Sequence, residues 1–211
     1  MEETTFIVTI EVLGTIAFAI SGIRLAAAKR FDWFGAYVVG LVTAIGGGTV
    51  RDVLLGLPVF WMVSWHYLAV TGLSLVAVIV FRQALVKGFR TLFLFDAIGL
   101  ALFVVVGIEK SLCAGWPMWV AIVMGVITGS FGGITRDILI NEVPLFFRKY
   151  IYATACLFGG VVYWLVAMLP VGVIVPQIAC AVAVLGLRIA AFTFNWSLPI
   201  LKVDPSSLPD E

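Results

Sequence analysis

The chain has 211 residues, of which 63% are hydrophobic and only 12% are charged. A water-soluble domain usually carries about 25% charged residues, so this composition excludes a soluble fold and indicates that lipid surrounds most of the chain. The net charge of +1 gives no case for nucleic acid as a partner.

A helix that crosses a bilayer needs about 20 mostly apolar residues. The first apolar run follows Glu2 and Glu3 and has no basic segment before it, so it is interpreted as a retained span and not as a signal peptide. Short connections leave no room for a soluble domain, and residues 191–211 are predicted to form a tail. Seven spans are predicted, at about 6–27, 33–56, 66–82, 91–109, 117–140, 150–169 and 172–190.

The basic residues predict how these spans are oriented. Lys110 is the one basic residue assigned to the side that holds the N-terminus, while Arg51 and Arg136 are assigned to the membrane interior. By the positive-inside rule the N-terminus is outside and the C-terminus is cytoplasmic, in an inner (plasma) membrane. Ten basic residues lie on the other side: Arg24, Lys29, Arg30, Arg82, Lys87, Arg90, Arg148, Lys149, Arg188 and Lys202.

An internal repeat appears when the sequence is shifted by 85 residues, because Gly47-Gly48 then falls on Gly132-Gly133. We expect three-span repeats at 1–85 and 86–170, a seventh helix at 171–190 and the tail at 191–211. A unit with three spans must insert in the opposite direction to its copy, so the predicted fold is an all-α inverted repeat with polar sites near the midplane. The other matched pairs include Arg51-Asp52 with Arg136-Asp137, Thr43 with Thr128, Glu11 with Asp96, and Tyr67 with Tyr152.

Glycines interrupt the second and fifth spans, at Gly46, Gly47 and Gly48 and again at Gly132 and Gly133. Each glycine weakens a helix by about 1 kcal/mol relative to alanine. The sequence therefore predicts that both helices are broken or kinked there, which marks a permeation or binding site in repeat proteins. The alternative for these small residues is close helix packing.

Hydroxyl side chains surround the two predicted breaks, at Thr49, Ser130 and Thr135. Hydroxyls and freed carbonyls are weak ligands that suit a partly dehydrated monovalent cation. The alternative is that each hydroxyl bonds only to a carbonyl of its own helix.

Two Arg-Asp pairs follow the glycines, Arg51-Asp52 and Arg136-Asp137. Adjacent residues on a helix diverge by about 100°, so we expect each arginine to pair with the aspartate of the other half. These charges either line a pathway or lock the halves together, and the sequence leaves the choice open.

Glu11 and Asp96 lie one to two turns into the first and fourth spans. They are interpreted either as vestibule carboxylates that concentrate cations or as helix-end residues that reach the headgroups. His66, beside Trp61, Trp65 and Tyr67, is expected at the membrane interface, with a pH-sensing role as the lesser option.

Signals of enzyme chemistry are missing from the sequence, which has no HExxH, CxxC or Walker A motif. Cys113, Cys156 and Cys180 are widely spaced and are expected to be packing residues. We therefore predict no catalytic activity, no cofactor and no metal site.

The segments GGGTVRDVLLG (46–56) and FGGITRDILINEVP (131–144) resemble the trimeric intracellular cation (TRIC) channel family, in its prokaryotic branch. The resemblance covers about Phe6 to Arg188. It implies a homotrimer with a pore in each protomer, beside kinks at the glycine motifs, that conducts potassium in preference to sodium. Animal members carry a lysine-glutamate-valine motif; here Thr135-Arg136-Asp137 or Asn141-Glu142-Val143 stands nearby, so lipid binding through that lysine is not implied.

Three functions remain open on these grounds. The first is a passive channel for potassium and sodium ions. The second is a transporter for a small zwitterion such as glycine, to which bacterial relatives have been linked, with Arg51 or Arg136 binding a carboxylate. The third is a non-conducting scaffold with packed kinks. The expected partners are monovalent cations, membrane lipid and further copies of the chain.

Overall fold

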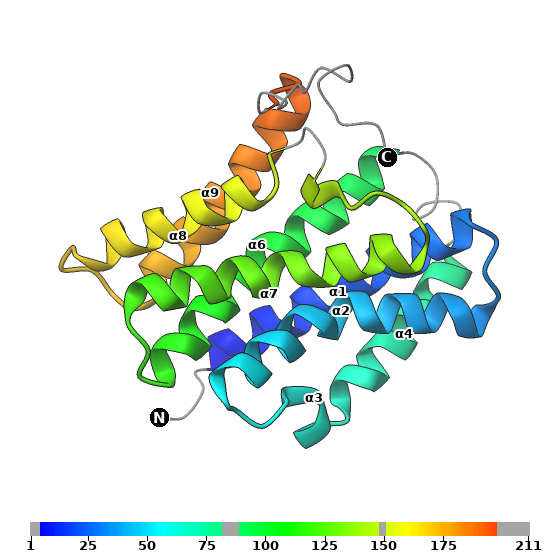
Figure 1. The fold of residues 1–211 in the computed structure, drawn as a ribbon, viewed down its shortest axis with the longest axis horizontal. Helices are drawn as coiled ribbons and strands as arrows, with labels where there is room; N and C mark the ends of the chain where they lie inside the picture. Colours follow the sequence, from blue (N-terminus) through cyan, green and yellow to red (C-terminus); the bar gives the residue numbers. More distant parts are fainter. Residues whose placement is uncertain (1–4, 82–88, 148–150, 198–211) are drawn as a thin grey trace, which may run out of the picture.

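The computed structural model describes residues 5–81, 89–147 and 151–197, which fold almost entirely into helices (Figure 1). Each of the seven predicted spans coincides with one helix longer than ten residues. The short helices α3 and η1 were not predicted, because four-residue and three-residue turns have no periodicity to detect. The elements are α1 (Thr5–Ala28), α2 (Trp33–Leu55), α3 (Phe60–Val63), α4 (His66–Val80), α6 (Phe89–Cys113), α7 (Met118–Leu139), η1 (Leu145–Phe147), α8 (Ala153–Ala167) and α9 (Ile174–Thr193).

Five helices are long and apolar enough to cross a membrane: α1, α2, α6, α7 and α9. The helices α4 and α8 are equally apolar but have only 15 residues each. Large apolar side chains are exposed on the outer faces, for example Trp33, Leu73, Trp119 and Val182 at 64–73% exposure. Such a surface would be insoluble in water, and it identifies an integral membrane protein.

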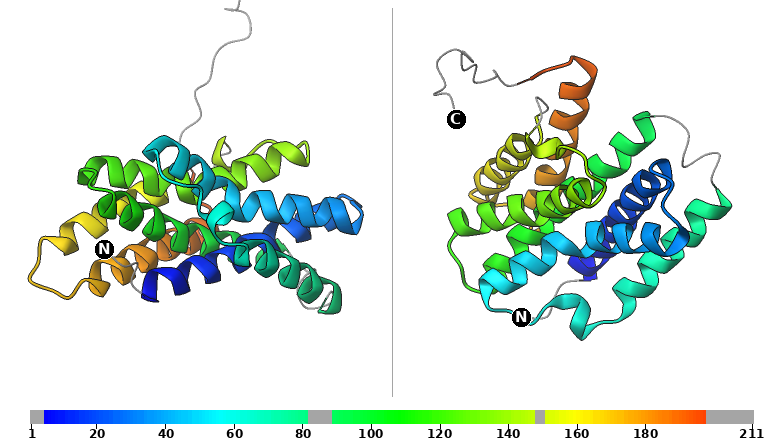
Figure 2. Two further views of the ribbon diagram at one scale, coloured as in Figure 1. Left: turned by 90° about the horizontal axis from the view of Figure 1, so that it is seen from below. Right: turned by 45° about the vertical axis from the view of Figure 1, so that its right-hand side comes forward.

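Four helices form the centre of the molecule (Figures 1 and 2). α1 packs on α2 and α6, and α7 packs on α2 and α6. The helix α4 lies against α1 and α2, while α8 lies against α7. α9, which has no counterpart in the repeat, packs on α8 and on α6.

The contacts between α1 and α6 are reciprocal. The Phe18 and Phe103 rings stack with their centroids 5.2 Å apart. A Cβ atom on Gly99 would overlap the Phe18 ring, and one on Gly14 would come within 3.2 Å of the Phe103 ring. Phe18 corresponds to Phe103 and Gly14 to Gly99 in the repeat. The glycine of each half therefore faces the phenylalanine of the other half, which is the signature of a two-fold axis between the halves.

Helix ends recur in the same 85-residue register. Gly56 and Asn141 follow α2 and α7 in the left-handed conformation, with φ of 67° and 57°. Arg30 and Gly115 follow α1 and α6, with φ of 62° and 85°. A left-handed residue lets the next amides bond the free carbonyls of the last helical turn. In each pair the two turns therefore share the left-handed conformation, although only one of the two residues is glycine.

The helices α2 and α7 run unbroken through their glycines, contrary to the predicted break. The glycines serve the crossing of the two helices instead. A Cβ atom on Gly47 would overlap the Thr128 carbonyl oxygen, and one on Gly132 would overlap the Thr43 carbonyl oxygen. The missing side chains let the two backbones touch, so packing accounts for these glycines in this conformation.

Two further motif glycines make room for aromatic side chains. A Cβ atom on Gly48 would lie 2.6 Å from the Phe60 ring, and one on Gly133 would lie 2.7 Å from the Tyr152 hydroxyl. Gly46 differs from the others, because its nearest neighbour would be the Gly132 Cα at an ordinary 3.6 Å.

Candidate functional site

Two cavities penetrate the molecule at opposite ends of α1. We call them the Lys110 cavity, of about 560 Å³, and the Arg136 cavity, of about 220 Å³. Ile7 lines the first and Ala28 lines the second. These residues are 21 positions apart on one helix, a rise of about 32 Å, which is the thickness of a hydrocarbon core.

The two cavities are lined by corresponding positions of the repeat, and both halves contribute to each. In the Lys110 cavity, Lys110, Cys113 and Ala114 come from the second half, and their counterparts line the Arg136 cavity from the first half. The arrangement is therefore two equivalent mouths with different side chains. The matched positions are Ile7 with Leu92, Asp52 with Asp137, Leu57 with Glu142, Pro58 with Val143, Phe60 with Leu145, Lys110 with Leu25, Cys113 with Ala28, and Ala114 with Lys29.

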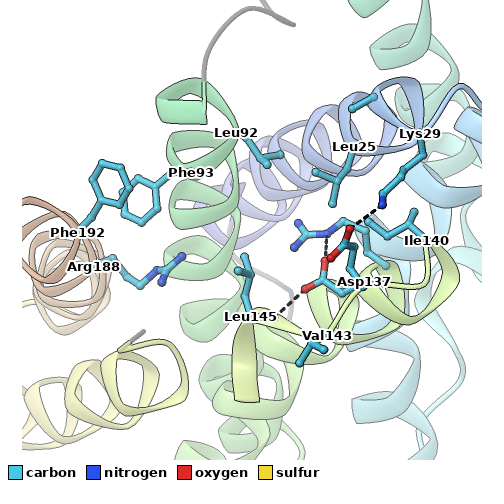
Figure 3. Close-up of a pocket in the computed structure, with 13 residues that line it drawn as sticks. Leu25, Lys29, Leu92, Phe93, Asp137, Ile140, Val143, Leu145, Arg188 and Phe192 are labelled. Atoms are coloured by element: carbon cyan, nitrogen blue, oxygen red, sulfur yellow. Dashed lines mark hydrogen bonds and ion pairs between the residues drawn. The ribbon is translucent and has the colours of Figure 1, made fainter. Parts of the chain in front are cut away.

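A buried charge network adjoins the Arg136 cavity, and Figure 3 shows two of its members, Asp137 and Arg188, among the lining side chains. The Arg136 Nε donates to Asp137 Oδ1 at 2.8 Å, and its Nη1 donates to Asp96 Oδ1 and to Ser21 Oγ, both at 2.8 Å. Arg188 Nη2 donates to the other oxygen of Asp96 at 3.1 Å. Two arginines and two aspartates therefore balance in charge, which offsets the high cost of burying ions.

The Lys110 cavity ends on a different ion pair. Lys110 Nζ lies 2.8 Å and 3.1 Å from the two carboxylate oxygens of Glu11, which is fully buried. The Tyr67 hydroxyl donates to Glu11 Oε2 at 2.7 Å. The pair joins α1 to α6 and so joins the two halves.

Among the described residues, Arg51 has fewer polar contacts than its counterpart Arg136 and binds only its neighbour Asp52. It is fully buried, and its Nε and Nη2 lie 2.8 Å and 2.7 Å from Asp52 Oδ1. Its Nη1 has no hydrogen-bond partner among the described residues. The difference arises because the carboxylate of Glu11 is bound by Lys110 and not by Arg51, whereas the equivalent carboxylate of Asp96 is bound by Arg136 itself.

The expected cross-pairing of the two Arg-Asp motifs is wrong, because each arginine binds the aspartate next to it. Contacts at Gly47–Thr128 and Thr43–Gly132 give α2 and α7 an antiparallel register. In that register residue 137 is level with residue 38, about 20 Å along the helix from Arg51. The flexible arginine side chain instead turns back to its neighbour.

Both motif aspartates also close the segment that follows their helix. Asp52 Oδ2 accepts the Phe60 amide at 2.9 Å, and Asp137 Oδ2 accepts the Leu145 amide at 2.9 Å. Each carboxylate thus lines a cavity and is held from two sides, by the neighbouring arginine and by a backbone amide.

Neither Glu11 nor Asp96 faces an open vestibule or the headgroups, since both are buried and ion-paired. A carboxylate two turns inside a membrane helix requires a cation, and the fold brings one from another element in each case. His66 is exposed, stacks on Trp65 and shares a 2.7 Å hydrogen bond with Ser64.

The hydroxyls near the glycines bond within their own helices. Thr49, Ser130 and Thr135 donate to the carbonyls of Ile45, Val126 and Phe131, at 2.6–2.8 Å. Thr49 Oγ1 also accepts the Trp61 indole N–H at 2.9 Å. The local alternative is therefore the one found for these three residues.

Sequence reasoning missed the inward charges near the helix ends. Arg24, Arg188 and Lys110 were counted among the charges on the two sides of the membrane, but the first two are buried and Lys110 is mostly enclosed. Long basic side chains reach inward from a helix end, so linear position misplaces them. Glu11 and Asp96 could have indicated these inward charges, because a carboxylate inside a membrane helix is costly unless a basic side chain pairs with it.

A family model described as glycine transporter matches residues 8–83 and again residues 93–168, two intervals that begin and end 85 residues apart. The UPF0126 inner membrane protein YadS of Escherichia coli K12 is 40% identical over 200 residues, covering 92% of this chain and 96% of YadS. The crystal structure of the TRIC channel orthologue from Rhodobacter sphaeroides is 34% identical, with a TM-score of 0.86, and it covers 91% of this chain and all of that one. The chain belongs to the prokaryotic branch of the TRIC family.

Further relatives agree with this family assignment. A UPF0126 membrane protein of Vibrio cholerae is 39% identical over 93% of the chain and 83% of its own length. A prokaryotic TRIC channel solved in 0.5 M KCl is 28% identical, with a TM-score of 0.83 over 93% of the chain and 100% of its own. The structural neighbours of this TRIC family member are channels and not enzymes.

Proposed function

We propose that this protein is a monovalent cation channel, permeable to potassium and sodium ions, with one pore in each protomer of a homotrimer. The observation that supports this proposal most directly is the pair of matched cavities, one at each end of α1, with the crossing of α2 and α7 between them. The solved relatives named as cation channels support the assignment.

The proposed pathway runs from the Lys110 cavity, past the α2–α7 crossing, to the Arg136 cavity. Asp52 lines the first of these cavities and Asp137 lines the second. The glycine contacts at the crossing close it, and it opens when α2 and α7 separate or bend at Gly46 to Gly48 and at Gly132 and Gly133. The broken helices expected from sequence then belong to the open state.

We further propose seven membrane spans in inverted repeats of three, with α4 and α8 as the shorter spans. The N-terminus is outside and the C-terminus is in the cytoplasm of the inner membrane. The Lys110 cavity then opens outward and the Arg136 cavity opens to the cytoplasm. Arg24 and Arg188 are buried and contribute little to the charge asymmetry between the two sides, but Lys29 and Arg30 keep its sign.

Selectivity for potassium over sodium is expected to be weak. A strict potassium filter uses rings of backbone carbonyls. Here the carbonyls of α2 and α7 are bonded within the helices, and charged side chains dominate the inner ends of both cavities.

A small-zwitterion transporter is the second candidate, favoured by the name of the matching family model and by one structural observation. The spare Nη1 of Arg51 is a buried donor that a carboxylate could satisfy. Two cavities with a closed centre also suit alternating access.

Single-channel recording separates these functions. Purified protein in planar bilayers, under a potassium/sodium gradient, should give discrete steps with a cation-sided reversal potential. Glycine is then added to one side and should leave the steps unchanged. Silent bilayers, together with saturable uptake of labelled glycine into liposomes made from the same protein, would replace the channel with the transporter.

A further inference from the structure

Glu109 is a buried carboxylate in the Lys110 cavity that neither Arg-Asp motif uses. Its Oε1 accepts the Tyr163 hydroxyl at 2.5 Å and the Gln177 Nε2 at 2.7 Å. These donors come from α8 and α9 and are neutral. Within the residues that the structure describes, no cation lies within ion-pair distance of Glu109.

The charges of the Lys110 cavity therefore do not balance. Glu11 is paired with Lys110, and Asp52 is paired with Arg51. Glu109 remains as one uncompensated negative charge, whereas the charges around the Arg136 cavity cancel in pairs. A buried carboxylate of this kind is costly unless a positive group joins it.

Gln177 supplies a second and independent indication of a ligand. Gln177 is only 2% exposed and lines the cavity, yet its Oε1 has no hydrogen-bond partner in the described part of the chain. Rotation of the amide would not satisfy this oxygen, because it would break the hydrogen bond from Nε2 to Glu109 and place Oε1 against the carboxylate. An unfilled acceptor next to an unbalanced carboxylate calls for a positively charged group.

We propose that Glu109 and Gln177 form a binding site for a small monovalent cation, either an alkali ion or a primary ammonium group. This site deepens the proposed function, on which its role in permeation rests: it recruits cations at the mouth of the Lys110 cavity. The corresponding position of the first half is Arg24, and Gln177 lies on the unrepeated α9, so the Arg136 cavity has no equivalent site.

Ion-dependent thermal stability of the purified full-length protein tests this proposal without requiring conduction. Choline chloride is replaced by potassium chloride, sodium chloride or methylammonium chloride at constant ionic strength. At least one of these cations should raise the melting temperature saturably, because it binds the folded protein. Glu109→Gln keeps the size and hydrogen-bonding reach of the side chain, and it should weaken the apparent affinity at least tenfold.

A variant far from the proposed site serves as the control. Asp32→Asn removes a carboxylate at the exposed start of α2 but keeps a good helix cap, so the ion dependence should persist. If Glu109→Gln does not fold, Gln177→Leu removes the neutral ligand and should weaken binding on its own.

The site is overturned if no cation stabilises the wild-type protein, or if Glu109→Gln and Gln177→Leu keep its ion dependence. The channel proposal fails separately. Cation binding that depends on Glu109 in a protein that forms no conductance would keep the site and remove the channel. Conductance without ion-specific stabilisation would keep the channel and remove the Glu109 site.

Discussion

Glu11 and Asp96 hold equivalent positions but meet different cations. Asp96 is bound by Arg136 from its own half and by Arg188 from α9, while Glu11 is bound by Lys110 from the opposite half. A buried carboxylate that loses its partner leaves an uncompensated charge, which is far more costly than the loss of an exposed pair. The two halves are thus tied together by a single lysine at one end.

Lys110→Met should test this tie, since methionine keeps much of the apolar stem and removes the charge. We expect the free energy of unfolding to fall by about 3–5 kcal/mol, because Glu11 is left buried and charged. Chemical or thermal unfolding in detergent measures the change.

The matched control is Lys29→Met, which breaks an ion pair with Glu142 that is about 40% exposed. It should cost at most about 1 kcal/mol. Adding Glu11→Gln to Lys110→Met should recover much of the lost stability. Equal effects of Lys110→Met and Lys29→Met would contradict the role given to the buried pair.

The residue scale also shows what sequence reasoning can reach. The repeat located Glu11, Asp96 and both Arg-Asp motifs in advance. It could not supply their partners, because Lys110 is 99 residues from Glu11 and Arg188 belongs to α9, outside the repeat. Pairing over such distances depends on helix register, which composition does not encode.

The helices α2 and α7 show the same limit at the scale of elements. Their positions were predicted to within a few residues, but glycine runs have the same composition whether they break a helix or let two helices touch. The structure distinguishes these cases because the glycines contribute unequally to the crossing. Gly47 lies against a carbonyl oxygen, whereas Gly46 has room for a methyl group.

This inequality gives a prediction for two neighbouring positions. Gly47→Ala should destabilise the protein, because its Cβ would overlap the Thr128 backbone, and backbone cannot move aside cheaply. Gly46→Ala should be neutral or should stabilise by up to about 1 kcal/mol, since alanine favours the helix and meets no close contact. Melting temperatures of the two variants, measured side by side, check the order.

The reverse order, with Gly46→Ala the more damaging change, would show that the glycines work as a break and not as a crossing. Single-channel recording of both variants then reports on opening. A channel that opens by bending at the glycines should open less often in Gly46→Ala even though its fold is intact.

At the scale of the whole molecule, equivalent positions of the sequence repeat line two cavities at opposite ends of α1, and in the proposed orientation these cavities open on the two sides of the membrane. Their lining residues correspond, but their chemistry differs: one has an excess carboxylate and an exposed cysteine, and the other has two balanced arginines. The proposed orientation assigns the first to the outside. That assignment can be tested with a side chain that the protein already has.

Cys113 lines the Lys110 cavity and is exposed, while Cys156 and Cys180 are fully buried. A membrane-impermeant maleimide applied to intact spheroplasts should therefore label the wild-type protein once, and Cys113→Ser should abolish the signal. Mass spectrometry of the labelled protein identifies the site. Labelling of Cys113 only in inside-out vesicles would reverse the orientation.

The ion pair between Glu11 and Lys110 has a consequence for how the protein is made. Glu11 enters the membrane with the first helix, whereas Lys110 is synthesised 99 residues later. At the usual elongation speed of about 5–20 residues per second, this interval lasts about 5–20 s. The nascent first half must therefore wait beside the insertion machinery with an unmatched acid, and it acquires its final core only when α6 arrives.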